Sequence, residues 1–204
     1  MSSPPPRDRD HDRAQLCVLL TGAAFVASLV RPPHPWEQQM QHLGTPAALL
    51  GLFALARRGG LGAASVAACC GFFLLHCVGA RWLYSHVPGG EWLTPFSLGG
   101  PPGRNHYDRL VHFAFGLLLA VPTREVLARY GGVRAWWAGG LAWGVVVAAG
   151  GLYEVFEWAL TAVADPAFAD RYNGLQGDAW DAQKDIALAA AGAGATGVVT
   201  GTRR

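Results

Sequence analysis

The chain has 204 residues, of which 51% are hydrophobic and only 15% are charged, with a mean hydropathy of +0.22. Because a soluble domain usually carries about 25% charged residues, this composition argues against an ordinary soluble protein. The net charge of +2, with no long basic run, gives no sign of nucleic-acid binding. Four cysteines lie in apolar segments and predict neither a disulfide framework nor a zinc framework.

The sequence predicts an all-α, multi-pass membrane protein. Residues 1–13 are proline-rich and charged, which predicts a disordered cytoplasmic tail. Residues 14–204 are expected to form one transmembrane domain of about six helices, because uncharged cores of about 16 to 20 residues suit a hydrocarbon layer about 30 Å thick. The expected spans are 14–30, 41–56, 59–83, 109–130, 135–163 and 181–202.

Two of these spans are less regular than the others. The second contains only a short apolar run, LGTPAALLGLFALA, and the fifth is long enough to need a tilt or a protruding end. A cleaved signal peptide is the alternative interpretation of the first span, because a basic flank precedes it and small residues lie near Ala27.

The distribution of basic residues predicts the orientation of the chain in the cell membrane. With the N-terminus inside, ten of the 16 Lys and Arg residues fall on the cytoplasmic side and six on the other side. The positive-inside rule therefore favours an arrangement with both termini in the cytoplasm. Ten of the 14 acidic residues then fall on the outer side, so the acids are concentrated at one membrane face.

Three of the predicted spans carry ionisable residues at their outer ends. A spacing of three or four residues places the members of each group on one helix face. An ionised acid facing lipid at this depth would cost a few kcal/mol, so we expect these side chains to face one another or a water-filled cavity. They are Asp108 and His112 in the fourth span, Glu154 and Glu157 in the fifth, and Asp178, Asp181 and Asp185 at the start of the sixth.

Carboxylates grouped with a histidine suit two kinds of chemistry. They can bind a divalent metal ion, or they can act as general acid and base. We therefore expect an outer polar pocket with a catalytic group, a metal group and a headgroup-binding group. The expected catalytic residues are Asp108, His112 and Glu157, the expected metal ligands are Asp181 and Asp185, and the expected headgroup-binding residues are Glu154, Gln176 and Asp178.

Each of these residues also has a structural interpretation. Asp178 could cap the sixth helix, where a carboxylate satisfies free backbone N–H groups. Either glutamate of the fifth span could form an ion pair with Arg109 or Arg81, and His112 could be a hydrogen-bonded packing residue.

Three segments carry a family resemblance: DRLVHFAFGLLLAVPTRE, YEVFEW and NGLQGDAWDAQKDIALAAAGA. Together they resemble the YjdF-like family of bacterial integral membrane proteins, over about residues 40 to 200. The resemblance implies a six-helix architecture in the cytoplasmic membrane and no established activity. The order of Asp108, His112, Glu157 and Asp181 is also remotely similar to that of VanZ-like membrane proteins.

Two functions of different classes remain open at this point. In the first, the protein is an enzyme or binding protein for a lipid or lipid-linked substrate, with a divalent metal ion as its cofactor. In the second, it is a non-enzymatic protein in which the acids form an ion or proton site, or a structural cluster that stabilises a partner. The absence of visible repeat halves disfavours a transporter.

Overall fold

The computed structural model describes residues 6–201, and this part of the chain contains helices and no strand. The helices are α1 (Pro6–Ser28), α2 (Pro35–Gln41), α3 (Thr45–Arg57), α4 (Ala63–Arg81), α5 (Tyr107–Arg129), α6 (Ala135–Val163), α7 (Pro166–Asn173) and α8 (Asp181–Gly201). Two short 3₁₀ helices, η1 (Gly90–Trp92) and η2 (Thr94–Phe96), lie in the connection between α4 and α5. The expected all-α class is therefore confirmed.

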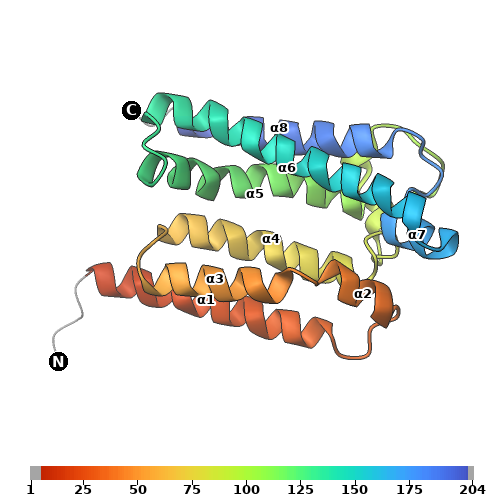
Figure 1. The fold of residues 1–204 in the computed structure, drawn as a ribbon, viewed down its shortest axis with the longest axis horizontal. Coiled ribbons are helices and arrows are strands. Elements are labelled where there is room, and N and C mark those ends of the chain that lie inside the picture. Colours follow the sequence, from red (N-terminus) through yellow and green to blue (C-terminus); the bar gives the residue numbers. More distant parts are fainter. Residues whose placement is uncertain (1–5, 202–204) are drawn as a thin grey trace.

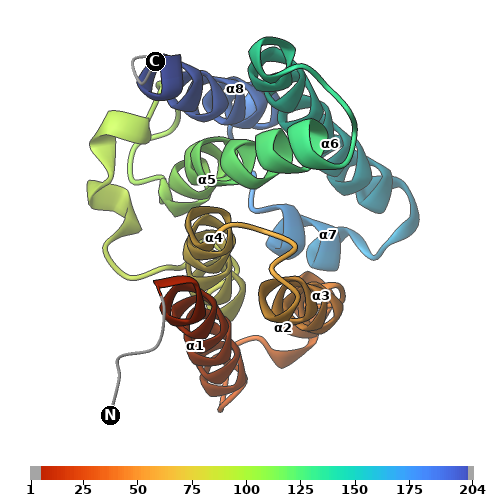
Figure 2. The ribbon, with the colours of Figure 1, turned by 90° about the vertical axis from the view of Figure 1, so that its left-hand side faces the viewer.

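The long helices form two groups that lie side by side (Figure 1). One group contains α1, α3 and α4, and the other contains α5, α6 and α8. Packing of α4 against α5 joins the groups, and α2 and α7 both lie at the same end of the molecule. The end-on view in Figure 2 shows α3 and α6 on the same side of the molecule.

Three of the described helices are long and apolar enough to cross a membrane: α4, α5 and α6. The other three expected spans correspond to α1, α3 and α8. Helix α3 has 13 residues, and a helix of this length covers only about 20 Å at 1.5 Å per residue. A six-span arrangement with both termini inside therefore stays a prediction.

The helix boundaries differ from the expected ones in three places. Helix α1 begins at Pro6 and so includes residues 6–13 of the expected disordered tail, whereas residues 1–5 lie outside the described part. The expected span 41–56 is interrupted near its start, since α2 ends at Gln41 and α3 begins at Thr45. Pro46 lacks a backbone N–H and fits the first turn of this new helix. Helix α7 was not expected, and Asp165 caps it through the amides of Ala167 and Phe168. Of the last expected span, Thr202 falls beyond the described residues.

The closest approach between helices is the packing of α5 against α8. A Cβ atom on Gly116 of α5 would collide with the Ala189 carbonyl of α8, and one on Gly192 of α8 would collide with the Phe113 carbonyl of α5. Small residues allow two backbones to approach this closely within a membrane. The contact fixes the start of α8 beside the start of α5, where most of the expected site residues lie.

Candidate functional site

Two buried arginines bind the aspartates at the start of α8. Arg104 donates to Asp181, and Arg109 donates to Asp178. Arg109 also lies 3.4 Å from Asp181, and the side chains of both arginines are fully buried. Through Arg104 these ion pairs attach the loop before α5 to the start of α8, and through Arg109 they attach the first turn of α5 to the loop before α8.

Asp178 has further partners in the loop before α8 and in the first turn of α8, and none of the observed bonds joins its side chain to an amide of that helix. Its Oδ1 accepts from the Trp180 amide at 3.1 Å, and Lys184 Nζ lies 2.6 Å from its Oδ2. Burial alone would raise the pKa of Asp178, but Lys184, the Trp180 amide and Arg109 together lower this pKa to about 2. The Asp178 carboxylate is therefore ionised and fully engaged in structural contacts.

Gln176 also has a structural role in this structure. Its Oε1 accepts from the backbone amide of Asn105 at 2.8 Å, and its Nε2 donates to the Asn105 carbonyl at 3.1 Å. The Gln176 amide thus forms two hydrogen bonds with the backbone N–H and carbonyl of Asn105, in the loop before α5.

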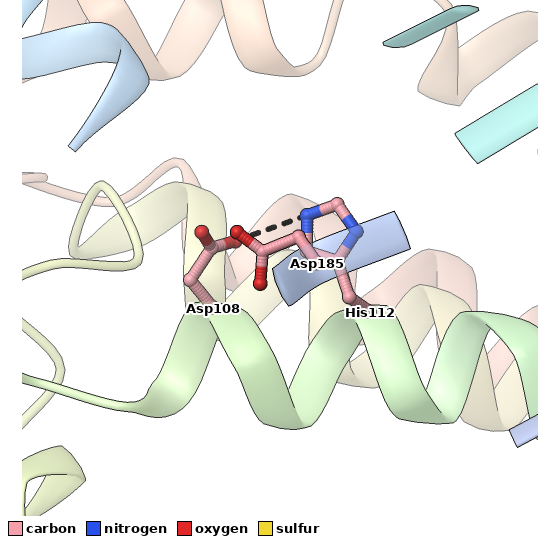
Figure 3. Close-up of side chains that lie close together, drawn as sticks. All are labelled: Asp108, His112 and Asp185. Atoms are coloured by element: carbon pink, nitrogen blue, oxygen red, sulfur yellow. Dashed lines mark ion pairs between the residues drawn. The ribbon is translucent and has the colours of Figure 1, made fainter. Parts of the chain in front are cut away.

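A second cluster contains Asp108, His112 and Asp185. Each of the three offers one ligand atom, and these atoms all lie within 4.8 Å of one another. Figure 3 shows the Asp185 carboxylate of α8 reaching toward Asp108 and His112, which lie one turn apart on α5. His112 Nε2 is 3.5 Å from Asp108 Oδ1 and also 3.5 Å from Glu154 Oε1 of α6. The tight α5–α8 contact and the adjoining α6 therefore bring four ionisable groups together.

Two carboxylate oxygens of this cluster have no hydrogen-bond donor among the described residues. They are Asp185 Oδ1 and Glu154 Oε1, on side chains whose residues are only 2% and 8% exposed. Buried polar atoms are usually paired, so each unpaired oxygen here needs an explanation.

A cavity of about 440 Å³ adjoins the cluster. Asp108, His112 and Glu157 line it, whereas Glu154 and Asp185 are not lining residues but lie close to His112. Asp178, Asp181 and Gln176 are not among its lining residues. The structure thus brings the expected catalytic residues to one cavity and places the other expected site residues outside it.

The cavity is polar at one end and apolar at the other. Four of the helices that line the cavity contribute a polar residue at the end near α2 and α7. These residues are Thr45 in α3, His76 in α4, Asp108 in α5 and Glu157 in α6. Further from that side the same helices contribute Ala48, Phe72, Phe115 and Ala149.

The wall opposite the acids contains a hydrogen-bonded chain that the sequence analysis did not predict. His76 Nδ1 lies 2.6 Å from the Tyr84 hydroxyl, and His76 Nε2 lies 3.1 Å from Thr45 Oγ1. Thr45 Oγ1 is also 3.4 Å from His42 Nδ1. The only sequence signal for this chain is a histidine, His76, inside an otherwise apolar segment.

These features define an all-helical protein with several helices long and apolar enough to cross a membrane, and with acids and histidines enclosed between its helices. Residues 14–204 match a family described as "Predicted membrane protein (DUF2238)", and the chain belongs to this family. Over 121 residues it is 39% identical to "Inner membrane protein YjdF" of Escherichia coli (strain K12). The matched region covers 57% of this chain and 54% of that protein, so the chain spans about half the length of this curated relative.

No solved structure matches the chain. The expected YjdF-like family and the inner-membrane location are confirmed by the comparisons with known proteins. The similarity to VanZ-like proteins stays a prediction.

Proposed function

We propose that this protein binds a lipid or lipid-linked substrate in the cavity between α3 and α6 and processes its headgroup at the acidic end, with assistance from a divalent metal ion. In this proposal six helices span the membrane, both termini are cytoplasmic, and the acidic end faces the extracytoplasmic side. The orientation rests on the excess of basic residues near the two termini.

The observation that carries the proposal is the graded polarity of the cavity. An amphipathic lipid has a polar head and an apolar tail, and the cavity has acids and histidines at one end and Phe72, Phe115 and alanines at the other. Ligand sites are usually apolar cavities with a few convergent polar groups, and their volumes begin near 300 Å³. A volume of about 440 Å³ suits a headgroup and the first part of one chain.

The sides of the cavity support entry from the bilayer. Helices α3 and α6 flank it, and neither packs extensively against the other in the described part of the chain. Their lining residues include Ala48 and Ala149, which are small and exposed. Figure 2 shows α7 between these two helices at the far end, and Tyr172 and Asn173 of α7 line the cavity there.

Asp108, His112 and Glu157 are the proposed catalytic residues, because they line the acidic end. The Asp108–His112 pair would orient or activate a reacting group, and Glu157 would serve as acid or base. Asn173, which donates to the Glu157 carbonyl at 2.9 Å, also lines this end and would contact the headgroup. Asp178, Asp181 and Gln176 support the site indirectly, because their side chains hold the first turn of α5 and the loop before it.

The test is native mass spectrometry of the purified protein. The wild-type chain is expected to retain a lipid after detergent exchange, and Ala149→Trp is expected to lose most of it because the indole would fill the opening. Leu152→Trp is the matched control, since Leu152 lies on the same helix, is 69% exposed and is not a lining residue. Equal lipid retention by the two variants would contradict lipid binding in this cavity.

A second candidate is a non-enzymatic role in which the acids are structural. The buried ion pairs of Arg104 and Arg109 favour it for Asp178 and Asp181. Under this alternative, Glu157→Gln would lower the folded yield and leave the retained lipid unchanged in composition. Under the proposed function, the folded Glu157→Gln protein would instead accumulate the unprocessed lipid.

A further inference from the structure

We propose that Asp108, His112 and Asp185 bind one divalent metal ion, with Glu154 as an adjoining carboxylate. This inference deepens the proposed function, because it assigns the metal ligands at the acidic end of the same cavity. It differs from the expectation drawn from the sequence, which placed the metal on Asp181 and Asp185.

The first support is the geometry of three ligand atoms. A carboxylate oxygen from Asp108, an imidazole nitrogen from His112 and a carboxylate oxygen from Asp185 lie within 4.8 Å of one another (Figure 3). Metal–ligand bonds of about 2 Å place ligand atoms about 3 to 4 Å apart across an ion, so small side-chain adjustments would close the site. One nitrogen and two or three oxygens suit Mn²⁺, Fe²⁺ or Zn²⁺.

The second support is independent of the spacing. Asp185 is 98% buried, since its exposure is 2%, and its Oδ1 has no hydrogen-bond partner in the described part of the chain. The same holds for Glu154 Oε1, which points toward His112 at 3.5 Å. A buried carboxylate oxygen without a donor is costly, and a cation bound by Asp185 would offset this cost.

The third support is the charge around the cluster. The neighbouring cations are already engaged: Arg104 and Arg109 bind Asp181 and Asp178, and Lys184 binds Asp178. Three carboxylates, those of Asp108, Glu154 and Asp185, therefore surround a single imidazole. A divalent ion would balance most of this negative charge, which no described side chain does.

The ion pairs also explain why Asp181 is not a ligand in this proposal. One Asp181 oxygen, Oδ1, faces both arginine side chains, and a metal ion would have to compete with two buried guanidinium groups. Asp185 lies one turn further along α8, beyond the reach of these guanidinium groups in the observed hydrogen bonds. The arginines thus separate a structural aspartate from a metal-binding one on the same helix face.

Asp108 and His112 line the cavity, whereas Asp185 and Glu154 do not, so a substrate in the cavity would meet the site at Asp108 and His112. A metal with an open position toward the cavity supplies a Lewis acid for a phosphoryl or carbonyl oxygen of a headgroup. No lysine or arginine among the described residues lines the cavity, so without a metal an anionic headgroup would meet acids, histidines and uncharged groups.

The test is Mn²⁺ binding to the intact, detergent-purified chain, measured by the loss of the free Mn²⁺ signal in electron paramagnetic resonance. Wild type is expected to bind one Mn²⁺ per chain, in competition with Zn²⁺. Asp185→Asn and His112→Gln are each expected to weaken binding at least tenfold. Glu91→Gln is the control, because Glu91 is an exposed acid in η1 that neither lines the cavity nor belongs to the three-residue group.

Each variant is compared only after its helical circular dichroism and its size-exclusion elution match those of wild type. If Asp185→Asn does not fold, Asp108→Asn replaces it, since Asp108 is less buried. Saturable binding lost in the ligand variants and kept in Glu91→Gln supports the assignment. Absence of saturable binding to the wild type, or equal loss in Glu91→Gln, overturns it. Neither result depends on a lipid, so failure of the metal site and failure of lipid binding are distinguishable.

Discussion

Asp178 illustrates how a single residue of the acid-rich segment contributes to stability. Its carboxylate is buried, and it contacts Arg109, Lys184 and the Trp180 amide. These partners hold its pKa at about 2, against an ordinary value of 3.8. Because the pKa in the folded protein is lower than in the unfolded chain, ionised Asp178 stabilises the fold, by about 2 kcal/mol at neutral pH.

This contribution should depend on pH with a definite sign. It is complete above a pH of about 4 and is lost as the pH falls toward about 2, where the folded protein also takes up the proton. We therefore expect Asp178→Asn to lower the thermal unfolding temperature clearly at pH 6, and the gap from wild type to narrow between about pH 4 and pH 2. A constant gap over this range would show that the charge of Asp178 is not what stabilises the fold.

Single residues also show where sequence reasoning reaches its limit. The four-residue spacing of Asp108 and His112 predicted that they share a helix face, and in the structure His112 Nε2 lies 3.5 Å from Asp108 Oδ1. The same reasoning treated Asp181 and Asp185 alike. Asp181 differs from Asp185 because Arg104 binds it, and Arg104 lies 77 residues from Asp181 along the chain. No local pattern identifies a partner that a distant loop supplies.

At the scale of elements, the glycines of α5 and α8 determine whether the site forms. Gly192→Ala is expected to push α8 away from α5, because the new Cβ would collide with the Phe113 carbonyl. Overpacking of this kind costs about 1–3 kcal/mol, so the unfolding temperature should fall. Mn²⁺ binding should weaken as well, since Asp185 lies on the displaced helix.

The matched control for this change is Gly194→Ala on the same helix. A Cβ there would meet only Trp143 Nε1 at 3.8 Å, which is an ordinary contact. Replacing glycine by alanine inside a helix otherwise stabilises it by up to about 1 kcal/mol. If both variants weaken Mn²⁺ binding to the same extent, the close approach at Gly192 is not what positions Asp185.

The sequence predicted most of the helical elements but not all of their ends. The span expected at 135–163 coincides with α6, because its apolar run is long and uninterrupted. The break between α2 and α3 was missed, since Pro46 was included within one apolar window. Helix α7 was missed because it is short and polar and depends on the Asp165 cap and on tertiary contacts, such as the 2.8 Å pair of Arg171 with Glu37. Hydropathy detects long spans and is insensitive to such short elements.

At the scale of the whole molecule, the cavity depends on both groups of helices. Its acids come from α5 and α6, and the opposite wall, with His76 and Thr45, comes from α3 and α4. The acidic side could be predicted from helical spacing and depth, because its residues recur at the ends of three apolar segments. The opposite wall could not, since it requires knowledge of which helices face each other. One link across the cavity is the hydrogen bond from the Tyr153 hydroxyl of α6 to Gln41 Oε1 of α2, at 3.3 Å.

The arrangement of the molecule in the membrane leads to a further prediction. If the acidic end is extracytoplasmic, the connection between α4 and α5 is outside and the connection between α3 and α4 is inside. Trp92 is 79% exposed in the first connection, and Arg58 is exposed in the second. A membrane-impermeant maleimide added to intact cells is therefore expected to label Trp92→Cys strongly and Arg58→Cys only after the membrane is permeabilised.

The unmodified chain provides the background for this experiment, because its four cysteines all lie in α1 and α4. Labelling of Arg58→Cys but not of Trp92→Cys in intact cells would reverse the orientation and place the acidic end at the cytoplasmic face. The cavity would then receive headgroups from the inner leaflet, and the metal at Asp108, His112 and Asp185 would come from the cytoplasm. Labelling of both positions in intact cells would instead contradict an odd number of spans between residues 58 and 92, so α4 would not cross the membrane and the six-span arrangement would be wrong.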